Sequence, residues 1–121
     1  MSQSLFEKYG GFATVSRIVS AFYDQVLESE RLSPYFAGLD MRRLVDHQTK
    51  FISALMGGPA SFSNEALQRA HSRLSIDNAA FDEAVDLLKM TFEDFDMEEG
   101  DIGILMGEVM SRRSYIVTRK G

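Results

Sequence analysis

The sequence predicts an all-helical fold in a single domain spanning residues 1–121. Apolar residues recur at spacings of three and four in one segment after another, as they do on the buried face of a helix. Corners containing glycine or proline separate these segments, and no apolar–polar alternation of strand length lies between them. With 121 residues, 45% apolar and 26% charged, the chain is long enough for one buried core and too short for a second lobe.

The first two helices are predicted on either side of a glycine pair. Ser4 and Glu7 have the spacing of a capping box, in which each side chain accepts a hydrogen bond from a free backbone amide. Gly10 and Gly11 are expected to end this short helix. A second helix is expected at about residues 14–29, with an apolar stripe made of Val15, Ile18, Val19, Phe22 and Val26.

The middle of the chain predicts a long and a short helix. Asp40 is placed to cap a third helix that continues to about Met56, where residues 57–59 (GGP) end it. A helix of about three turns follows, starting at Ser63 or Asn64. The apolar faces are Met41, Leu44, Phe51, Ile52 and Leu55 in the long helix, and Leu67, Ala70 and Leu74 in the short one.

Two longer helices are predicted in the last third of the chain. Asp77 can cap the first of them, with Ile76 packing against its start, and the acidic residues 97–101 separate it from the second. The final helix is expected to continue to about Ile116, with four basic residues suited to the negative end of its dipole. These are Arg112, Arg113, Arg119 and Lys120, and the apolar stripes are Phe81, Ala84, Val85, Leu88, Phe92 and Phe95, then Ile102, Leu105, Val109 and Ile116.

Composition excludes several classes of protein. Without cysteine the chain has no disulfide, thiolate nucleophile, iron–sulfur ligand or cysteine zinc site, so metal chemistry would have to use histidine or carboxylates. A net charge of −5 argues against a nucleic-acid partner. No apolar run is long enough to span a bilayer and the first residues do not resemble a signal peptide, so we expect no membrane association and a cytoplasmic location.

Three polar residues fall on apolar helix faces. On a helical projection Gln48 lies within the apolar arc of its helix, with His47 on the flank. His71 shares the inward stripe of the short helix, and Tyr23 lies at the edge of the second helix's stripe. An unpaired buried amide costs about 1–3 kcal/mol, so Gln48 is expected to bond a neighbour, a water or a ligand.

Two interpretations of these residues remain open on periodicity alone. His71 could be a core residue bonded to a backbone carbonyl, and Gln48 and Tyr23 could satisfy each other. Alternatively the residues form a site, but two histidines build no tetrahedral zinc centre unaided. Haem differs, because its porphyrin supplies four nitrogens and the protein need give only one imidazole and an apolar slot.

Several segments resemble the group I truncated haemoglobins, in the order and at the spacing of that family, over nearly the whole chain. They are residues 4–11 (SLFEKYGG), 22–27 (FYDQVL), 32–38 (LSPYFAG), 47–51 (HQTKF), 57–59 (GGP) and 67–71 (LQRAH). This resemblance implies a truncated globin fold, a two-over-two helical sandwich that encloses haem b.

The resemblance also assigns roles to individual residues. His71 matches the proximal ligand of the haem iron, and Phe36 matches the aromatic residue packed on the haem at a helix corner. Tyr23, Leu44 and Gln48 match the distal pocket, where the hydroxyl and the amide would donate hydrogen bonds to bound oxygen.

Four further residues are expected to contact the cofactor. Phe51 and Leu67 would pack on the haem, while Lys50 and Arg73 would pair with its propionates. Ordinary solvated charges give the same pattern as the last two.

His47 has two interpretations. In some relatives, notably cyanobacterial ones, a histidine directly before the distal glutamine binds iron when oxygen is absent, which makes His47 a candidate sixth ligand; otherwise it is a solvated residue near a propionate. The chain departs from those members near Arg112, where its last helix has no histidine, so a covalent link to haem is not expected.

The expected function is therefore reversible binding of oxygen, nitric oxide or carbon monoxide by a monomer or weak dimer. Nitric oxide dioxygenation is a further expected activity, and because the chain has no flavin or nicotinamide motif it would need a separate reductase. The alternatives are a six-coordinate redox or sensor protein that uses both histidines, and a haem-free helical interaction or sensor module.

Overall fold

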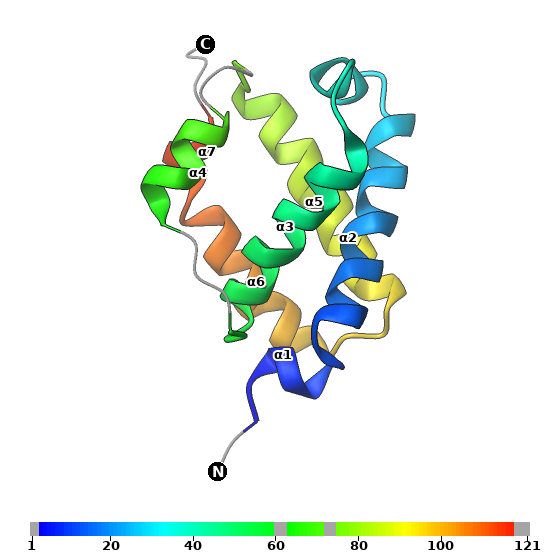
Figure 1. Ribbon diagram of the computed structural model, residues 1–121, viewed down its shortest axis with the longest axis vertical. Coiled ribbons are helices and arrows are strands. Elements are labelled where there is room, and N and C mark those ends of the chain that lie inside the picture. The colour runs from blue at the N-terminus through cyan, green and yellow to red at the C-terminus, as the bar shows by residue number, and fades with distance from the viewer. Residues whose placement is uncertain (1–2, 60–62, 72–74, 118–121) are drawn as a thin grey trace.

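The computed structural model describes residues 3–59, 63–71 and 75–117, and every regular element in these ranges is helical, as predicted (Figure 1). The elements are α1 (Leu5–Lys8), α2 (Gly11–Glu28), the 3₁₀ turn η1 (Ser33–Phe36), α3 (Met41–Leu55), α4 (Asn64–His71), α5 (Asn78–Asp94), α6 (Glu99–Met110) and α7 (Arg113–Ile116). Arg73, Leu74, Arg119 and Lys120, which the sequence analysis singled out, lie outside the described residues.

The four longest helices form the predicted two-over-two sandwich. Helix α2 packs against α3 within one layer and against α5 in the other, and α5 packs against α6. Figure 1 shows α2 beside α3, and α4 beside the short α7 at the edge of the sandwich. The predicted stripe of α2 is the centre of the core, where Val15, Ile18, Val19 and Val26 are almost completely buried.

Three of the predicted helix caps are present. The carboxylates of Asp40 and Asp77 accept from the amides of Arg43 and Ala80, at 3.3 and 2.8 Å. The Ser4 hydroxyl accepts from the Glu7 amide at 3.1 Å. The capping box is nevertheless incomplete, because the Glu7 carboxylate accepts from the Ser4 hydroxyl at 3.2 Å and not from a backbone amide.

The prediction of one continuous final helix is wrong. Helix α6 ends at Met110, because the Ser111 hydroxyl and the Arg112 guanidinium both donate to the Glu108 carbonyl at 2.8 Å and take the place of backbone donors. Arg113 then begins the separate helix α7. The break before α6 is also shorter than the predicted acidic stretch, because α6 already starts at Glu99. Acidic side chains are stabilised in the first turn of a helix by the positive end of its dipole.

Two other boundaries differ from the prediction. Helix α2 starts at Gly11, three residues early, because Gly10 turns the chain in the left-handed region (φ 104°) and α2 follows at once. The turn η1 was not predicted. Pro34 stands in its first turn, where the fixed φ of proline suits a helical start.

Glycine at position 58 allows α1 to pack closely against the end of α3. A Cβ at Gly58 would lie 2.7 Å from the Phe6 ring, and the Gly58 amide donates to the Ser53 carbonyl at 2.8 Å. The Phe6 amide donates to the Met56 carbonyl at 3.0 Å. The corner therefore joins the amino-terminal helix to the sandwich through both backbone and ring contacts.

A polar cluster joins α1 to the start of α6. The Lys8 ammonium lies 2.7 Å from the Asp101 carboxylate and 3.0 Å from that of Glu98. The Tyr9 hydroxyl donates to Asp101 at 2.6 Å and accepts from the Glu98 amide at 3.0 Å. The hydrogen bonds from Lys8 and then Tyr9 lower the pKa of Asp101 below its usual value.

In the described part of the chain, we find no helix that combines the length and the apolar character needed to cross a bilayer.

Replacing Ser53 by alanine is expected to stabilise the protein. The Ser53 side chain is fully buried (0% exposed), and its hydroxyl has no hydrogen-bond partner among the described residues. Removing an unpaired buried hydroxyl should raise the free energy of unfolding by about 1 kcal/mol. Urea unfolding of Ser53→Ala measures this, and Ser20→Ala on the exposed side of α2 corrects for the helix propensity of alanine. Equal effects at both positions would mean that Ser53 is satisfied.

Asp101→Asn is expected to alter how stability depends on pH. Because the pKa of Asp101 is lower folded than unfolded, its charge stabilises the fold above the unfolded pKa of about 3.9, and this contribution is lost as pH falls through the folded pKa. The parent should therefore be the more stable protein at pH 6, with the difference shrinking below about pH 4. Urea unfolding across this range is the measurement, and a difference independent of pH would exclude the ionised carboxylate as its cause.

Candidate functional site

A cavity of about 450 Å³ lies between the two layers of the sandwich. Its walls come from α2, η1, α3, α5, α6 and α7, and His71 enters from α4. Almost all of the surrounding side chains are apolar; among the described residues the polar groups come from Tyr23, Tyr35, Gln48 and His71. The apolar walls include Val19, Phe22, Val26, Leu32, Phe36, Leu44, Phe51, Ile52, Ile76, Phe81, Val85, Leu88, Val109 and Ile116.

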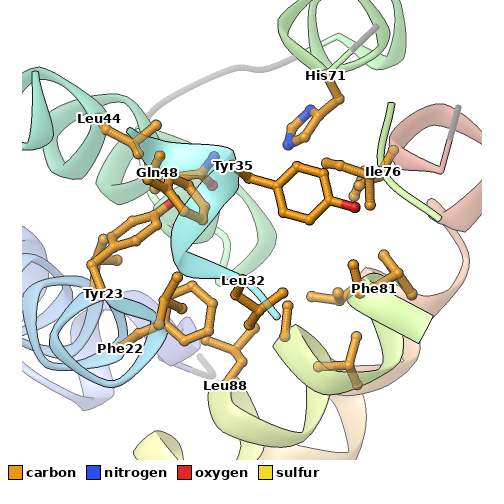
Figure 2. Close-up of a pocket in the computed structure, with 18 of the residues that line it drawn as sticks. Phe22, Tyr23, Leu32, Tyr35, Leu44, Gln48, His71, Ile76, Phe81 and Leu88 are labelled. Carbon is orange, nitrogen blue, oxygen red and sulfur yellow. The ribbon is translucent and has the colours of Figure 1, made fainter. Parts of the chain in front are cut away.

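His71 is the last residue of α4, and its ring points into the cavity (Figure 2). The Nδ1 atom lies 2.8 Å from the carbonyl oxygen of Leu67, one turn earlier on the same helix. Since a carbonyl only accepts, Nδ1 must carry the proton, and the lone pair of the neutral ring is then on Nε2. Burial lowers the pKa of His71, against the smaller effect of the Leu67 bond, so the ring is neutral at pH 7.

Tyr23 projects into the cavity from α2. Its side chain is only 6% exposed, and burial raises the pKa of the phenol, so the hydroxyl keeps its proton. The Tyr23 ring meets Phe22 and Phe36 edge to face, with centroids 5.1 and 5.6 Å apart, and these contacts fix its orientation. The structure gives the hydroxyl no hydrogen bond to the described residues, so it is a free donor at the cavity wall.

Gln48 and Leu44 lie one turn apart on the inner face of α3. Both are half-buried and line the cavity. In Figure 2 they lie with Tyr23 on one side of the cavity, while His71 approaches from the other. An imidazole lone pair therefore faces a hydroxyl and an amide across an apolar space.

Six of the ten predicted site residues come together around this cavity. They are Tyr23, Phe36, Leu44, Gln48, Phe51 and His71.

Three of the other four do not line the cavity, and the fourth lies outside the described residues. Leu67 is buried and acts on the site through its carbonyl, which holds the His71 ring. Lys50 is exposed and pairs with Asp46 at 3.4 Å on the outer face of α3. His47 is exposed, so the structure does not bring it into the cavity, and Arg73 lies outside the described residues.

Tyr35 is a site residue that the sequence reasoning missed. It belongs to η1, between Pro34 and Phe36, and its half-buried ring extends into the cavity toward Ile76 (Figure 2). Helical periodicity gives no signal for such a residue, because a 3₁₀ turn follows a different period. The only available signal was its place beside Phe36 in the segment LSPYFAG.

The cavity suits an apolar group that brings its own metal ligands. Among residues 3–59, 63–71 and 75–117, no three histidine, cysteine or carboxylate side chains are placed so that they could hold a metal ion together. A metal ion inside this cavity would therefore find one imidazole nitrogen among the described protein atoms, that of His71. Hydrogen-bond donors on the opposite side suit a ligand that carries partial negative charge.

Comparison with known proteins agrees with this geometry. The sequence profile of the family described as bacterial-like globin matches residues 4–117. A group 1 truncated hemoglobin of Tetrahymena thermophila is 30% identical over 100 residues, covering 83% of each chain. A protein of the same description from Synechocystis is 29% identical over 100 residues, covering 79% of this chain and 81% of its own.

Solved structures extend the similarity to the whole fold. The 2/2 hemoglobin of Synechococcus sp. PCC 7002, in the cyanomet state with covalently attached heme, superposes with a TM-score of 0.89 at 28% identity, covering 97% of this chain and all of its own. The truncated hemoglobin of Tetrahymena pyriformis in its Fe(III) form gives 0.82 at 27% identity, covering 98% and 100%. With its family profile, sequence relatives and fold in agreement, this chain belongs to the bacterial-like globins, among the group 1 truncated haemoglobins.

Proposed function

We propose that this chain holds haem b in the cavity beneath α4 and reversibly binds oxygen and other diatomic ligands there. One observation carries the proposal: the Nε2 lone pair of a half-buried, neutral His71 faces the donors of Tyr23 and Gln48 across an apolar cavity. When bound there, haem would supply an iron atom able to bind both a protein nitrogen and a diatomic gas. The cavity volume of about 450 Å³ lies within the range of small-molecule and cofactor sites.

His71 is the proximal ligand in this proposal. Its Nδ1–H bond to Leu67 selects the tautomer, leaves Nε2 free and restrains rotation of the ring. Because burial lowers the pKa of the ring, protons compete less for Nε2 at neutral pH. Acid that protonates Nε2 should therefore weaken retention of the cofactor.

Tyr23 and Gln48 hold the gas ligand on the distal side. Each presents a donor in an apolar space, where a hydrogen bond to a partly charged acceptor is stronger than in water. Phe22 and Phe36 keep the Tyr23 ring in place before the ligand arrives, which reduces the loss of side-chain freedom on binding. The apolar walls, including Leu44 and Phe51, exclude water that would compete for these donors.

The polar edge of the cofactor is assigned to Lys50 and Arg73 on the basis of family resemblance. The Lys50–Asp46 pair is exposed, and exposed pairs contribute about 0–1 kcal/mol, so Lys50 can exchange Asp46 for a propionate at little cost.

The outer position of His47 supports an open site for the gas ligand. His47 is exposed on α3, whereas Gln48 faces the cavity, so iron ligation by His47 would require α3 to turn or unwind locally. A covalent attachment like that of the Synechococcus protein is not part of this proposal, because the chain's two histidines are His47 and His71 and neither lies in its last helix.

We also assign to this site the conversion of nitric oxide to nitrate, in which dioxygen would supply both added oxygen atoms and the ferrous cofactor one electron. Because the chain carries no flavin or nicotinamide motif, we assign the return of the cofactor to its ferrous form to a separate reductase. Carbon monoxide is expected to compete with oxygen and nitric oxide. We further propose that the protein works in the cytoplasm as a monomer or weak dimer.

His71→Ala should abolish stable, histidine-ligated haem binding, whereas His47→Ala should preserve it. The reason is that only His71 presents a ring nitrogen to the cavity. Titration of each purified protein with haem, followed by absorption spectroscopy in the ferric and ferrous states, makes the comparison. Failure of the parent to give an intense Soret band would support a haem-free module. Identical spectra for the parent and His71→Ala would also contradict the proposal.

Tyr23→Phe should release oxygen roughly 10- to 100-fold faster than the parent, because it loses a hydrogen bond to a partly charged ligand. Tyr35→Phe is a matched control. It removes the other phenol hydroxyl of the cavity, which points away from Tyr23 and Gln48 (Figure 2), so its rate should stay close to the parent's. Stopped-flow displacement of oxygen by carbon monoxide gives the three rates. Equal rates for Tyr23→Phe and the parent would rule out Tyr23 as the ligand-holding donor.

A further inference from the structure

The helix that carries His71 relies on a neighbouring short helix for support. Helix α4 has eight residues, ends at His71 and packs against α7, as Figure 1 shows. Helix α7 has only four residues, too few to form a stable helix alone. The position of α7 must therefore be set by contacts with the rest of the fold.

Tyr115 and Ile116 pack α7 against the core, and Arg113, its first residue, makes contacts with α5. Its guanidinium lies 2.6 Å from the Asp82 carboxylate, donates to the Asn78 side-chain oxygen at 2.9 Å, and is centred 4.6 Å from the Phe81 ring. All three partners lie in the first turns of α5. A planar guanidinium with two hydrogen bonds and one stacking contact is restrained in both position and orientation, in a way that an ammonium is not.

These contacts reach the cavity from two directions. Phe81 is buried and lines the cavity, and Arg113 stacks on its ring. Ile116, one turn after Arg113 on α7, lines the cavity as well. A shift of α7 would therefore move a wall of the cavity and the support of α4 together.

We infer that Arg113 is a positioning residue, which holds His71 at its place over the cavity by fixing α7 to the start of α5. The inference rests on the proposed function, because it concerns the geometry of the proximal ligand. Arg113 is not a ligand of the cofactor and does not line the cavity.

The neighbouring Arg112 is a matched control. Its bonds to described residues are all local, at 2.8 Å to the Glu108 carbonyl, 2.9 Å to the Glu108 carboxylate and 3.4 Å to the Ser111 hydroxyl. Its substitution removes the same charge from the same region. The Ser111 hydroxyl still donates to the Glu108 carbonyl at the end of α6, and the Arg113 contacts between α7 and α5 remain.

The test compares Arg113→Ala, Arg113→Lys and Arg112→Ala with the parent, each loaded with haem. Resonance Raman spectroscopy of the ferrous, unligated proteins measures the iron–histidine stretch, and transfer of haem to excess apomyoglobin measures the rate of haem loss. Arg113→Ala should shift or broaden the stretch and lose haem roughly 3- to 10-fold faster. Both the stretch and the rate of haem loss of Arg113→Lys should fall between those of Arg113→Ala and the parent. Arg112→Ala should match the parent in both.

Asp82→Asn provides a second route should Arg113→Ala fail to fold, because it weakens the ion pair and keeps the shape of the side chain. It should change both readouts in the same direction as Arg113→Lys. A parent-like stretch and haem-loss rate in Arg113→Ala, or in a folded Asp82→Asn when Arg113→Ala does not fold, would overturn the inference, as would an equal change in Arg112→Ala. Absence of any iron–histidine stretch in the parent would instead overturn the proposed function on which the inference rests.

Discussion

The hydrogen bond from Nδ1–H of His71 to the Leu67 carbonyl is the interaction on which the site depends. It is local, spanning one turn of α4, yet it determines which ring nitrogen is free and where that nitrogen points. Burial then lowers the pKa of the ring and keeps the lone pair available at neutral pH. A histidine with the opposite tautomer would present an N–H to the cavity and could not bind a metal there.

The opposite wall shows a different balance between stability and function. The side chains of Tyr23 and Gln48 make no hydrogen bond to the described residues, at a wall where an ordinary core would place leucine or phenylalanine. At Tyr23 the surrounding rings fix the side chain without satisfying it, so the donor remains available for a ligand. The core of α2 and α5 has no such deficit: the buried Thr91 accepts from Gln25 at 3.0 Å and donates to the Leu87 carbonyl at 2.8 Å.

The sequence predicted the features governed by local rules. The caps at Asp40 and Asp77, the buried stripe of α2 and the inward direction of Gln48 follow from side-chain chemistry and a period of 3.6 residues. The end of α6 was missed, because it depends on side chains of Ser111 and Arg112 competing for one carbonyl, which periodicity does not detect.

Features that depend on tertiary contacts could not be predicted from the sequence either. Tyr35 enters the cavity from a 3₁₀ turn, and Arg113 bridges two helices that are separated in the chain by α6. The tautomer of His71 required the position of a specific carbonyl. Family resemblance supplied the role of His71, and the structure supplied the physical arrangement that makes this role feasible.

The most direct test of the account is NMR spectroscopy of the haem-loaded ferrous protein, unligated and labelled with ¹⁵N at histidine. The chain has two histidines, so the two ring systems can be assigned with a single His47 substitution. The account predicts one strongly shifted Nδ1–H signal, which belongs to His71, exchanges slowly with solvent and persists when His47 is replaced. A shifted signal that belongs to His47, or a His71 ring with the chemical shifts of a free, solvent-exchanging imidazole, would contradict it.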